Sequence, residues 1–406
     1  MTRTRIALLV STILAATTMT GCQSLSQPQT FDRDAAFLSR HAETIVLRSE
    51  DGMSRIAVVP QYQGRVMTST AGGEMGDSYG YLNYDLIRSG KPVPKISVWG
   101  GEDRFWMGPE GGQFAIFFKK GDEFTLEDWQ TPAPIDSAAY EVVSKTDQSV
   151  TLTHTCALTN YSGTQLDVKV DRIVRLVDRA AVARDLGVDV GSSAMVAFES
   201  DNTITNVGSA AWTRESGLLS IWILGMFRPS DDCTVVIPFK QGSEAALGPI
   251  VKDDYFGKVP EDRLEVSERA IFFKADSRMR TKIGVGPGRS LPVCGSWNPS
   301  GNVLTIVSYT LQPGTSLATP YINSMWEMQK DPYAGDVINS YNDAPGKHGP
   351  TFYELETSSP ALALSPGQSA SHLHRTIHLT GERVDLDRIA KHVLGVGLDE
   401  IEDAIR

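Results

Sequence analysis

Short segments that alternate apolar and polar residues, separated by turn signals, run through most of the chain and limit its fold more than any other feature. The clearest are 140–158 and 166–177, which flank a polar, glycine-containing turn and are typical of a β-hairpin. A second hairpin is predicted within 44–60. Further strands are predicted at 66–70, 95–99, 218–227, 234–238, 269–273, 281–285, 303–311 and 361–364. This series predicts an all-β fold, a large antiparallel sandwich.

Two segments at the end of the chain have a different pattern. Residues 384–394 and 398–405 follow Gly381 and predict two short helices on the outside of the sandwich. The 406 residues allow one large all-β domain or two smaller ones. We expect a single β domain over 35–406 that carries these helices.

The N-terminal segment has the pattern of a targeting sequence. An apolar run at 6–16, preceded by two arginines, is too short for a transmembrane helix and predicts a signal peptide at 1–21. Its end resembles a bacterial lipoprotein cleavage box, which implies that Cys22 is lipidated. Gln23 follows in place of Asp, which favours the outer membrane facing the periplasm, with 22–34 as a tether. The alternative is ordinary secretion, with Cys22 incidental.

Charge and cysteine content exclude some classes of function. The formal net charge is −11, which disfavours a nucleic-acid partner and suits sugars or other neutral or cationic small molecules. Cys156, Cys233 and Cys294 are odd in number and far apart, so they form neither a disulfide framework nor a CxxC metal motif. One pair would still be able to bond in an oxidising periplasm, but buried free thiols are the simpler interpretation.

The strongest candidates for acid and base chemistry lie late in the chain. In the predicted strand 351–357, Phe352, Glu354 and Glu356 point to one face because side chains two apart share a face. In the predicted strand 371–379, apolar residues occupy one face and three histidines share the other: His372, His374 and His378.

If these two strands are neighbours, two carboxylates and three imidazoles face the same way. Such a site would both remove and donate protons near neutral pH. The alternative is a solvated polar face of an antiparallel sheet, which needs no function.

Two glycine-rich or oxygen-rich regions supply candidate binding residues. Glycines on both sides of 100–112 predict a loop held close to other backbone, from which Arg104 or Glu110 would reach a ligand. The alternative is that these two residues form an internal ion pair that pins the loop.

The irregular region 323–343 is rich in aromatic and oxygen-bearing side chains. Its aromatic residues would lie against sugar rings: Trp326, Tyr333 and Tyr341. Its polar residues would bond hydroxyls or hold Ca²⁺: Asp336, Asn339 and Asp343. A well-packed long loop without a ligand is the alternative.

Several segments resemble the galactose-mutarotase-like supersandwich, the fold of aldose 1-epimerases. They are VVPQYQGRVMTST, GGEDRFWMGPEGG, the long hairpins and FYELETSSP. Pro60 with Gly64-Arg65 is similar to the early P-x-x-G-G-R strand of those enzymes, with Gln63 in place of the first glycine.

The late segment carries the functional part of this resemblance. Residues 355–357 with Pro360 are similar to the late L-E-T-Q segment, whose glutamate is the general base, with Ser358 in place of glutamine. The resemblance therefore gives the base role to Glu356. The family's N-H-x-Y-F-N segment, which carries the acid, has no counterpart, so His348, His372 or His374 would supply it.

The whole mature chain is also similar to a family of bacterial proteins, often lipoproteins, that share N-S-Y-N-D, F-Y-E-L-E-T-S-S-P and H-R-T-I-H. The leading hypothesis is a lipid-anchored periplasmic protein that acts on a carbohydrate without a cofactor. Glu356 would take the anomeric hydroxyl proton, His374 would donate to the ring oxygen, and Arg104 would orient the sugar. His348, Tyr341 and the residues named above would bind it.

Two other classes of function stay open. The same aromatic region would serve a non-catalytic carbohydrate-binding lipoprotein. A metal-dependent lyase or hydrolase, in which His372 and His374 with a carboxylate hold a divalent ion, is the third hypothesis.

Overall fold

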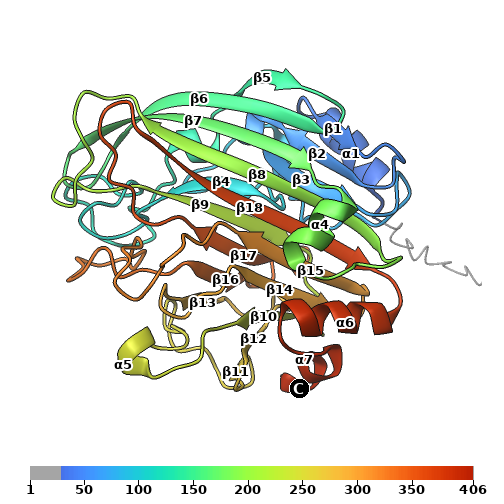
Figure 1. Cartoon of the computed structure of the whole chain (residues 1–406). Helices are drawn as coiled ribbons and strands as arrows, with labels where there is room; N and C mark the ends of the chain where they lie inside the picture. Colours follow the sequence, from blue (N-terminus) through green and yellow to red (C-terminus); the bar gives the residue numbers. More distant parts are fainter. Residues whose placement is uncertain (1–28, 406) are drawn as a thin grey trace, which may run out of the picture.

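The computed structural model describes residues 29–405, which form three antiparallel sheets and a few short helices (Figure 1). The predicted signal peptide and Cys22 lie outside the described residues. The predicted all-β antiparallel sandwich with short C-terminal helices is confirmed. Within 29–405, no helix is both long and apolar enough to cross a membrane.

The largest sheet has ten strands. In spatial order they are β11 (Leu264–Val266), β12 (Ala270–Lys274), β10 (Thr234–Pro238), β14 (Val293–Asn298), β15 (Val303–Tyr309), β18 (Ser369–Thr380), β8 (Ala194–Asn206), β7 (Gln165–Leu176), β6 (Ser149–Thr159) and β5 (Glu141–Lys145). The predicted hairpin is β6–β7, closed where Thr159 faces Gln165. Buried and exposed residues alternate along both strands, because one face meets the core and the other meets water.

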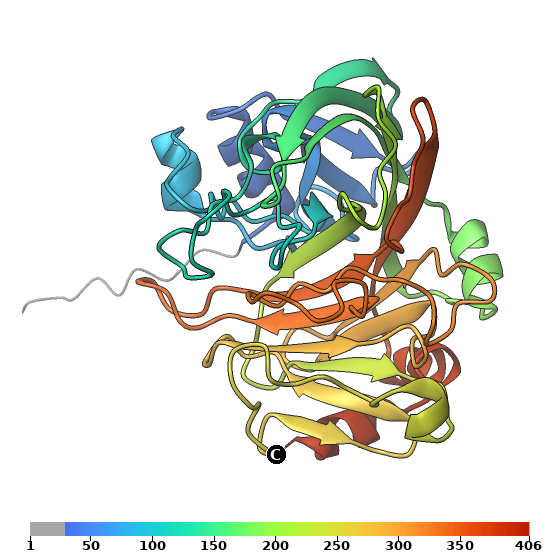
Figure 2. The same cartoon turned by 90° about the vertical axis from the view of Figure 1, so that its left-hand side faces the viewer.

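The two smaller sheets lie against this large one. The five-stranded sheet has the order β13 (Thr281–Val285), β16 (Ile338–Asn342), β17 (Tyr353–Ser358), β9 (Ser220–Phe227) and β4 (Arg104–Gly108). The three-stranded sheet has the order β1 (Ile45–Arg48), β2 (Arg55–Val59) and β3 (Arg65–Thr70). Figure 2 shows the layers from the side.

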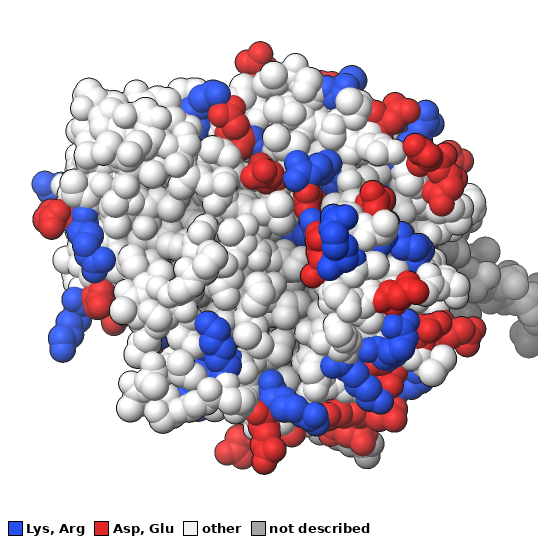
Figure 3. Space-filling model, viewed as in Figure 1, with Lys and Arg blue, Asp and Glu red and all other residues white. Residues whose placement is uncertain are grey.

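Helices occupy the connections and the end of the chain. They are α1 (Phe31–Ser39), the 3-10 helix η1 (Pro60–Tyr62), α2 (Tyr84–Ser89), α3 (Ala133–Asp136), α4 (Arg179–Leu186), α5 (Glu244–Leu247), α6 (Arg383–Val393) and α7 (Leu398–Ala404). On the face seen in Figure 3, charged side chains of both signs gather around α4 and α6, so the acidic excess does not form a patch of one sign there.

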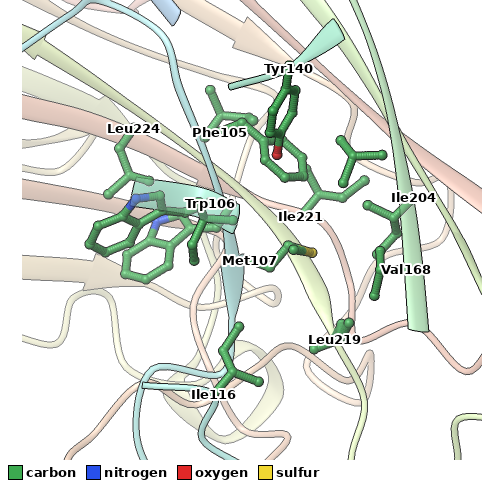
Figure 4. Packing of buried hydrophobic residues seen from close by; sticks show 14 of the residues in the cluster. Phe105, Trp106, Met107, Ile116, Tyr140, Val168, Ile204, Leu219, Ile221 and Leu224 are labelled. Atoms are coloured by element: carbon green, nitrogen blue, oxygen red, sulfur yellow. The ribbon is translucent and has the colours of Figure 1, made fainter. Parts of the chain in front are cut away.

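Hydrophobic clusters cover both faces of the ten-stranded sheet. Between the sheets, Val168 and Ile204 pack with Phe105, Met107 and Ile221 of the five-stranded sheet (Figure 4). On the opposite face, apolar residues of β18 and β15 pack against α4, α6 and α7: Ile377, Leu379, Leu304, Val182, Leu386 and Leu398. The large sheet is therefore buried on both faces over its central strands.

Four local expectations from the sequence are wrong. Residues 95–99 form no strand, and 361–364 contributes only an isolated bridge between Leu362 and Leu219. The segment 100–112 is not a loop throughout, since Arg104–Gly108 is the edge strand β4. Helix α1 begins at Phe31, so the end of the segment assigned to a tether is helical. Tertiary pairing overrides these weak local signals.

Candidate active-site cavity

A cavity of about 560 Å³ lies over the five-stranded sheet, on the face turned away from the ten-stranded sheet. Strand alternation decides which residues reach it. In β4, Arg104 and Trp106 line the cavity, whereas Phe105 and Met107 belong to the core between the sheets.

The two glutamates of β17 share the cavity face of the strand, as the two-residue period predicts. Glu354 lines the cavity, and Glu356 lies next to it, fully buried. Thr357 lies on the opposite face, because its hydroxyl bonds side chains of the ten-stranded sheet. Each glutamate is paired with a cation that comes from a different side of β17.

Glu354 pairs with Arg104 across the intervening strand β9. The Arg104 Nη2 donates to Glu354 Oε1 at 2.8 Å, and the two side chains are 3% and 6% exposed. Burial raises the pKa of Glu354 to about 8, although the Arg104 charge acts in the opposite direction. Glu354 therefore holds a proton through much of the neutral range and can donate it.

Glu356 pairs with Lys282, which comes from the other side across β16. The Lys282 Nζ and the Trp222 Nε1 both donate to Glu356 Oε2, at 3.0 and 2.9 Å. The second oxygen, Oε1, is buried and has no hydrogen-bond partner among the described residues. Lys282 and Trp222 both line the cavity, so Glu356 adjoins the cavity through the two groups that hold it.

Sequence reasoning missed Lys282 and Trp222. Both lie in strands that the sequence predicted, and β13 has the sequence TKIGV, in which Lys282 is the single charged residue. A lone lysine in an otherwise apolar, buried strand needs a buried partner, and that signal was available. Nothing in the sequence shows that the partner is Glu356.

Indole rings form much of the cavity wall. Trp129 and Trp326 stack with ring centroids 5.7 Å apart, and Trp106 meets Trp222 edge to face at 5.4 Å. Trp326 was predicted to bind sugar rings, and the structure places it in this wall. The wall offers flat apolar faces beside the polar floor of the cavity.

Close contact between two loops brings Glu110 and Trp326 into the same cavity. A Cβ at Gly111 would lie 2.1 Å from the Met325 carbonyl oxygen, so only glycine allows this approach. Glu110 lines the cavity, and burial raises its pKa. The ion pair considered between Glu110 and Arg104 is not formed, because the carboxylate that meets Arg104 is Glu354.

Of the remaining candidate binding residues, two line the cavity. The Tyr341 hydroxyl donates to Asp343 Oδ1 at 2.8 Å, and Thr351 donates to the other oxygen at 2.7 Å. Asn339 lies outside the lining and donates to the Ile283 carbonyl at 3.2 Å.

His348 and Asp336 also differ from their expected places. His348 is exposed on a loop, with its Nε2 2.8 Å from Asp85 Oδ2, and is not part of the cavity lining. Asp336 pairs with Lys252 at 3.1 Å and accepts from Tyr255, so it does not join Asp343 in a calcium site.

The condition on which the shared acid and base site depended, that the histidine strand lies beside the glutamate strand, is not met. Strand β17 pairs with β16 and β9, whereas β18 pairs with β15 and β8 in the other sheet. Both His372 Nε2 and His374 Nδ1 contact the Thr357 hydroxyl, at 2.8 and 2.9 Å, on the face opposite the glutamates. These imidazoles lie between the sheets, outside the cavity lining.

Burial changes the proton affinity of these histidines. It lowers the pKa of His372 to about 3 and that of His374 to about 4. His378 lies in the same layer and contacts Glu102 at 2.8 Å. A buried neutral imidazole that cannot reach the cavity does not supply the acid that the sequence assigned to His374.

A third arrangement considered from the sequence was a metal site. Among residues 29–405, no group of three or more His, Cys, Asp or Glu side chains is arranged to hold a metal ion. His372 and His374 share a threonine hydroxyl and not a carboxylate. The metal-dependent hypothesis has no ligand set in the described part of the chain.

Comparison with known proteins gives a family and a fold. The model of a family of unknown function (DUF6786) matches residues 29–405. No curated protein matches the sequence. The structure is similar to the Slr1438 protein from Synechocystis sp. PCC 6803, at 14% identity and a TM-score of 0.51, over 84% of this chain and 96% of that one.

Two further solved structures are similar to this chain. A galactose mutarotase-like protein from Lactobacillus casei ATCC 334 has 10% identity and a TM-score of 0.47, over 83% of this chain and 100% of that one. A galactose mutarotase related enzyme from Lactobacillus acidophilus has 8% identity and a TM-score of 0.45, over 84% and 98%. Identities as low as these concern the fold alone.

Proposed function

The chain belongs to the DUF6786 family and has a galactose mutarotase-like fold, and from that premise we propose that its cavity binds a carbohydrate and catalyses epimerase-like proton transfer on it. The observation that carries the proposal is the pair of glutamates on β17. Glu354 and Glu356 share one face of one strand, each has its own cation, and both adjoin a cavity walled by tryptophans.

The composition of the cavity supports a sugar ligand. Flat indole faces suit the apolar faces of pyranose rings, and a few convergent charged groups suit hydroxyls. Trp129 and Trp326 offer such a stacked surface, and Arg104, Lys282 and Glu354 supply the polar contacts. A volume of about 560 Å³ holds one or a few sugar units.

The two glutamates take different roles in this proposal. Glu356 accepts the anomeric hydroxyl proton at its unpartnered Oε1 while the bond between the anomeric carbon and the ring oxygen breaks. Glu354, which burial keeps protonated, donates its proton to the ring oxygen. Rotation in the open-chain aldehyde and return of both protons give the other anomer and restore both carboxyls.

Each cation stabilises the negative charge that its glutamate carries in this scheme. The Lys282 ammonium at 3.0 Å stabilises the charge of Glu356, and the Arg104 guanidinium stabilises the carboxylate that Glu354 becomes after it donates. This assignment replaces the histidine acid expected from the sequence with a second carboxyl group.

Proton NMR of the purified protein with freshly dissolved α-anomers tests the proposal. Accelerated exchange between anomers of at least one sugar is the expected result. Sugars whose resonances broaden without accelerated exchange would show binding without catalysis, and unchanged spectra for neutral and acidic sugars would reject the proposal.

A non-catalytic carbohydrate-binding protein is the second candidate. It is favoured by the fact that both carboxylates are already bonded to cations and that none of the seven histidines lines the cavity. The same NMR experiment separates the two candidates, because only the first changes the rate of exchange.

We also propose that the protein is anchored through lipidated Cys22 to the outer membrane, facing the periplasm. The support is the sequence alone, through the apolar run at 6–16 and the cleavage box that ends at Cys22. Cys22→Ser is expected to move the protein from the membrane fraction to the soluble periplasmic fraction. Retention of that variant in the membrane would contradict the anchor.

A further inference from the structure

The cavity holds more positive charge than the chain as a whole would suggest. The chain has a formal net charge of −11, yet three cationic side chains line this one cavity: Arg104, Arg280 and Lys282. Arg104 and Lys282 have the glutamate partners described above. Arg280 has no carboxylate within ion-pair distance among residues 29–405.

Arg280 is held in place by an aromatic ring instead of an acid. Its guanidinium carbon lies 3.9 Å from the centre of the Phe256 ring and 6.0 Å from that of Tyr341. Phe256 and Tyr341 both line the cavity, and Arg280 itself is exposed. Stacking fixes the plane of a guanidinium and leaves its N–H edge open for a planar acceptor.

Deeper in the cavity, a second arginine has unused donors. Arg104 bonds Glu354 through Nη2, but its Nε and Nη1 are buried and have no partner in the described chain. The Trp106 indole nitrogen is buried and unpartnered in the same way. Buried donors are normally paired, so this wall lacks acceptors that a ligand would provide.

The acidic residues of the lining do not cancel these donors. Three acidic residues line the cavity: Glu110, Asp343 and Glu354. Asp343 already accepts from Tyr341 and Thr351, and burial raises the pKa of Glu110 and that of Glu354, the latter to about 8. The mouth and wall of the cavity therefore favour a ligand with oxygen acceptors and negative charge.

We propose that the carbohydrate is an acidic sugar, a uronic acid unit whose carboxylate binds Arg280 at the cavity mouth while its hydroxyls meet Arg104. This inference rests on the proposed carbohydrate site and specifies its substrate class. A carboxylate matches the fork of a guanidinium with two parallel hydrogen bonds, which a neutral sugar cannot form. The aromatic wall then holds the ring of the same sugar unit.

Tryptophan fluorescence titrations with matched sugars test this inference, because indole rings line the cavity. Galacturonate is compared with galactose, and glucuronate with glucose, so that each pair differs only at the sixth carbon. The variants are Arg280→Ala and, as a matched control, Arg278→Ala, which removes an exposed arginine that pairs with Asp231 outside the cavity.

We expect the better uronate to bind about tenfold or more tightly than its neutral partner at low salt. Arg280→Ala removes most of that difference and leaves the neutral sugar unchanged, while Arg278→Ala behaves as the wild type. Added salt weakens only the uronate. Arg280 is exposed, so its removal does not endanger the fold.

The outcomes that would contradict the acidic-sugar inference differ in what they reject. Equal affinity within both pairs, or equal effects of the two arginine variants, overturns the acidic-sugar inference and leaves carbohydrate binding in place. A sugar 6-phosphate that binds more tightly than the uronate overturns the choice of carboxylate. Absence of binding by all four sugars overturns this inference and the proposed function together.

Discussion

Asp103 and Arg104 are adjacent in sequence, and each takes part in a buried contact between an arginine and an acidic side chain, on opposite sides of the five-stranded sheet. Asp103 points between the sheets, where Arg172 and Ser200 donate to its two oxygens. Arg172 also donates to the Gly64 carbonyl and to Asn202. Arg104 points into the cavity, where only one of its three nitrogens has a partner.

This difference distinguishes side chains that stabilise the fold from side chains whose open hydrogen-bond donors are available to a ligand. A charge pair whose every donor and acceptor is matched leaves nothing for a ligand to bond, and its cost of burial is offset internally. A pair with open donors beside a cavity is stable only with help from solvent or a ligand. By this criterion the Asp103–Arg172 pair is structural, and the Arg104–Glu354 pair belongs to the binding site.

Glu356→Gln tests most directly whether the charged groups beside the cavity act on a ligand. We expect turnover to fall by about 10²–10⁴-fold, because glutamine cannot accept the anomeric proton, while sugar binding is kept. Anomer exchange by NMR measures turnover, and fluorescence titration measures binding. Thermal unfolding serves as the control for the fold, since Lys282 loses its counter-charge. Full turnover would remove Glu356 from the chemistry.

The two arginine pairs can be compared by matched substitutions. Arg172→Leu leaves Asp103 buried without a cation and is expected to cost about 3–5 kcal/mol of unfolding free energy. Arg104→Leu is expected to cost less, about 1–3 kcal/mol, because Glu354 faces the cavity and can keep its proton. Urea denaturation measures both. Equal costs would mean that the cavity pair is as structural as the buried one.

Thr357→Val changes the residue next to Glu356 on the opposite face of β17. It removes the hydroxyl that His372 and His374 share, and we expect a loss of about 1–3 kcal/mol in unfolding free energy with unchanged turnover. Denaturation and the anomer-exchange assay, run on the same preparation, check both parts. If turnover were lost while the unfolding free energy stayed unchanged, His372 or His374 would have a part in catalysis.

The histidine layer also predicts how stability depends on pH. Burial lowers the pKa of His374 from 6.5 to about 4, so between these values the unfolded chain binds a proton that the folded chain does not. Unfolding free energy therefore falls as the pH drops from about 6.5 towards 4, by up to about 1.4 kcal/mol per pH unit for His374, and His372, with its pKa lowered to about 3, adds a slope of the same sign. His374→Gln should remove its own share of this slope and leave that of His372. An unchanged slope would assign it to other groups.

The smallest predicted effect is on the pH dependence of turnover and concerns the carboxyl group of Glu354. If Glu354 donates the proton, turnover declines as the pH rises above about 8, where Glu354 loses it. In Glu354→Gln the residual turnover should lose this alkaline decline. The pH–rate profiles of the two proteins provide the measurement, and a decline that persists in the variant belongs to another group.

The sequence by itself determined the β architecture and the sharing of faces. Alternation placed Glu354 with Glu356 and His372 with His374, because the two-residue period of a strand is a local property of the backbone. The same local logic located the β6–β7 hairpin and the two terminal helices. Trp326, Tyr341 and Asp343 were also recognised, since their region is conspicuous in composition.

Only the tertiary structure decided which faces meet. Whether β18 or β16 lies beside β17 depends on pairing between residues far apart in the chain, which no local pattern encodes. The same holds for Arg104 with Glu354 and for Lys282 with Glu356, which are joined across other strands. The apolar face of β18 is covered by α6 and α7, so its histidine face turns inward, away from water and from the cavity.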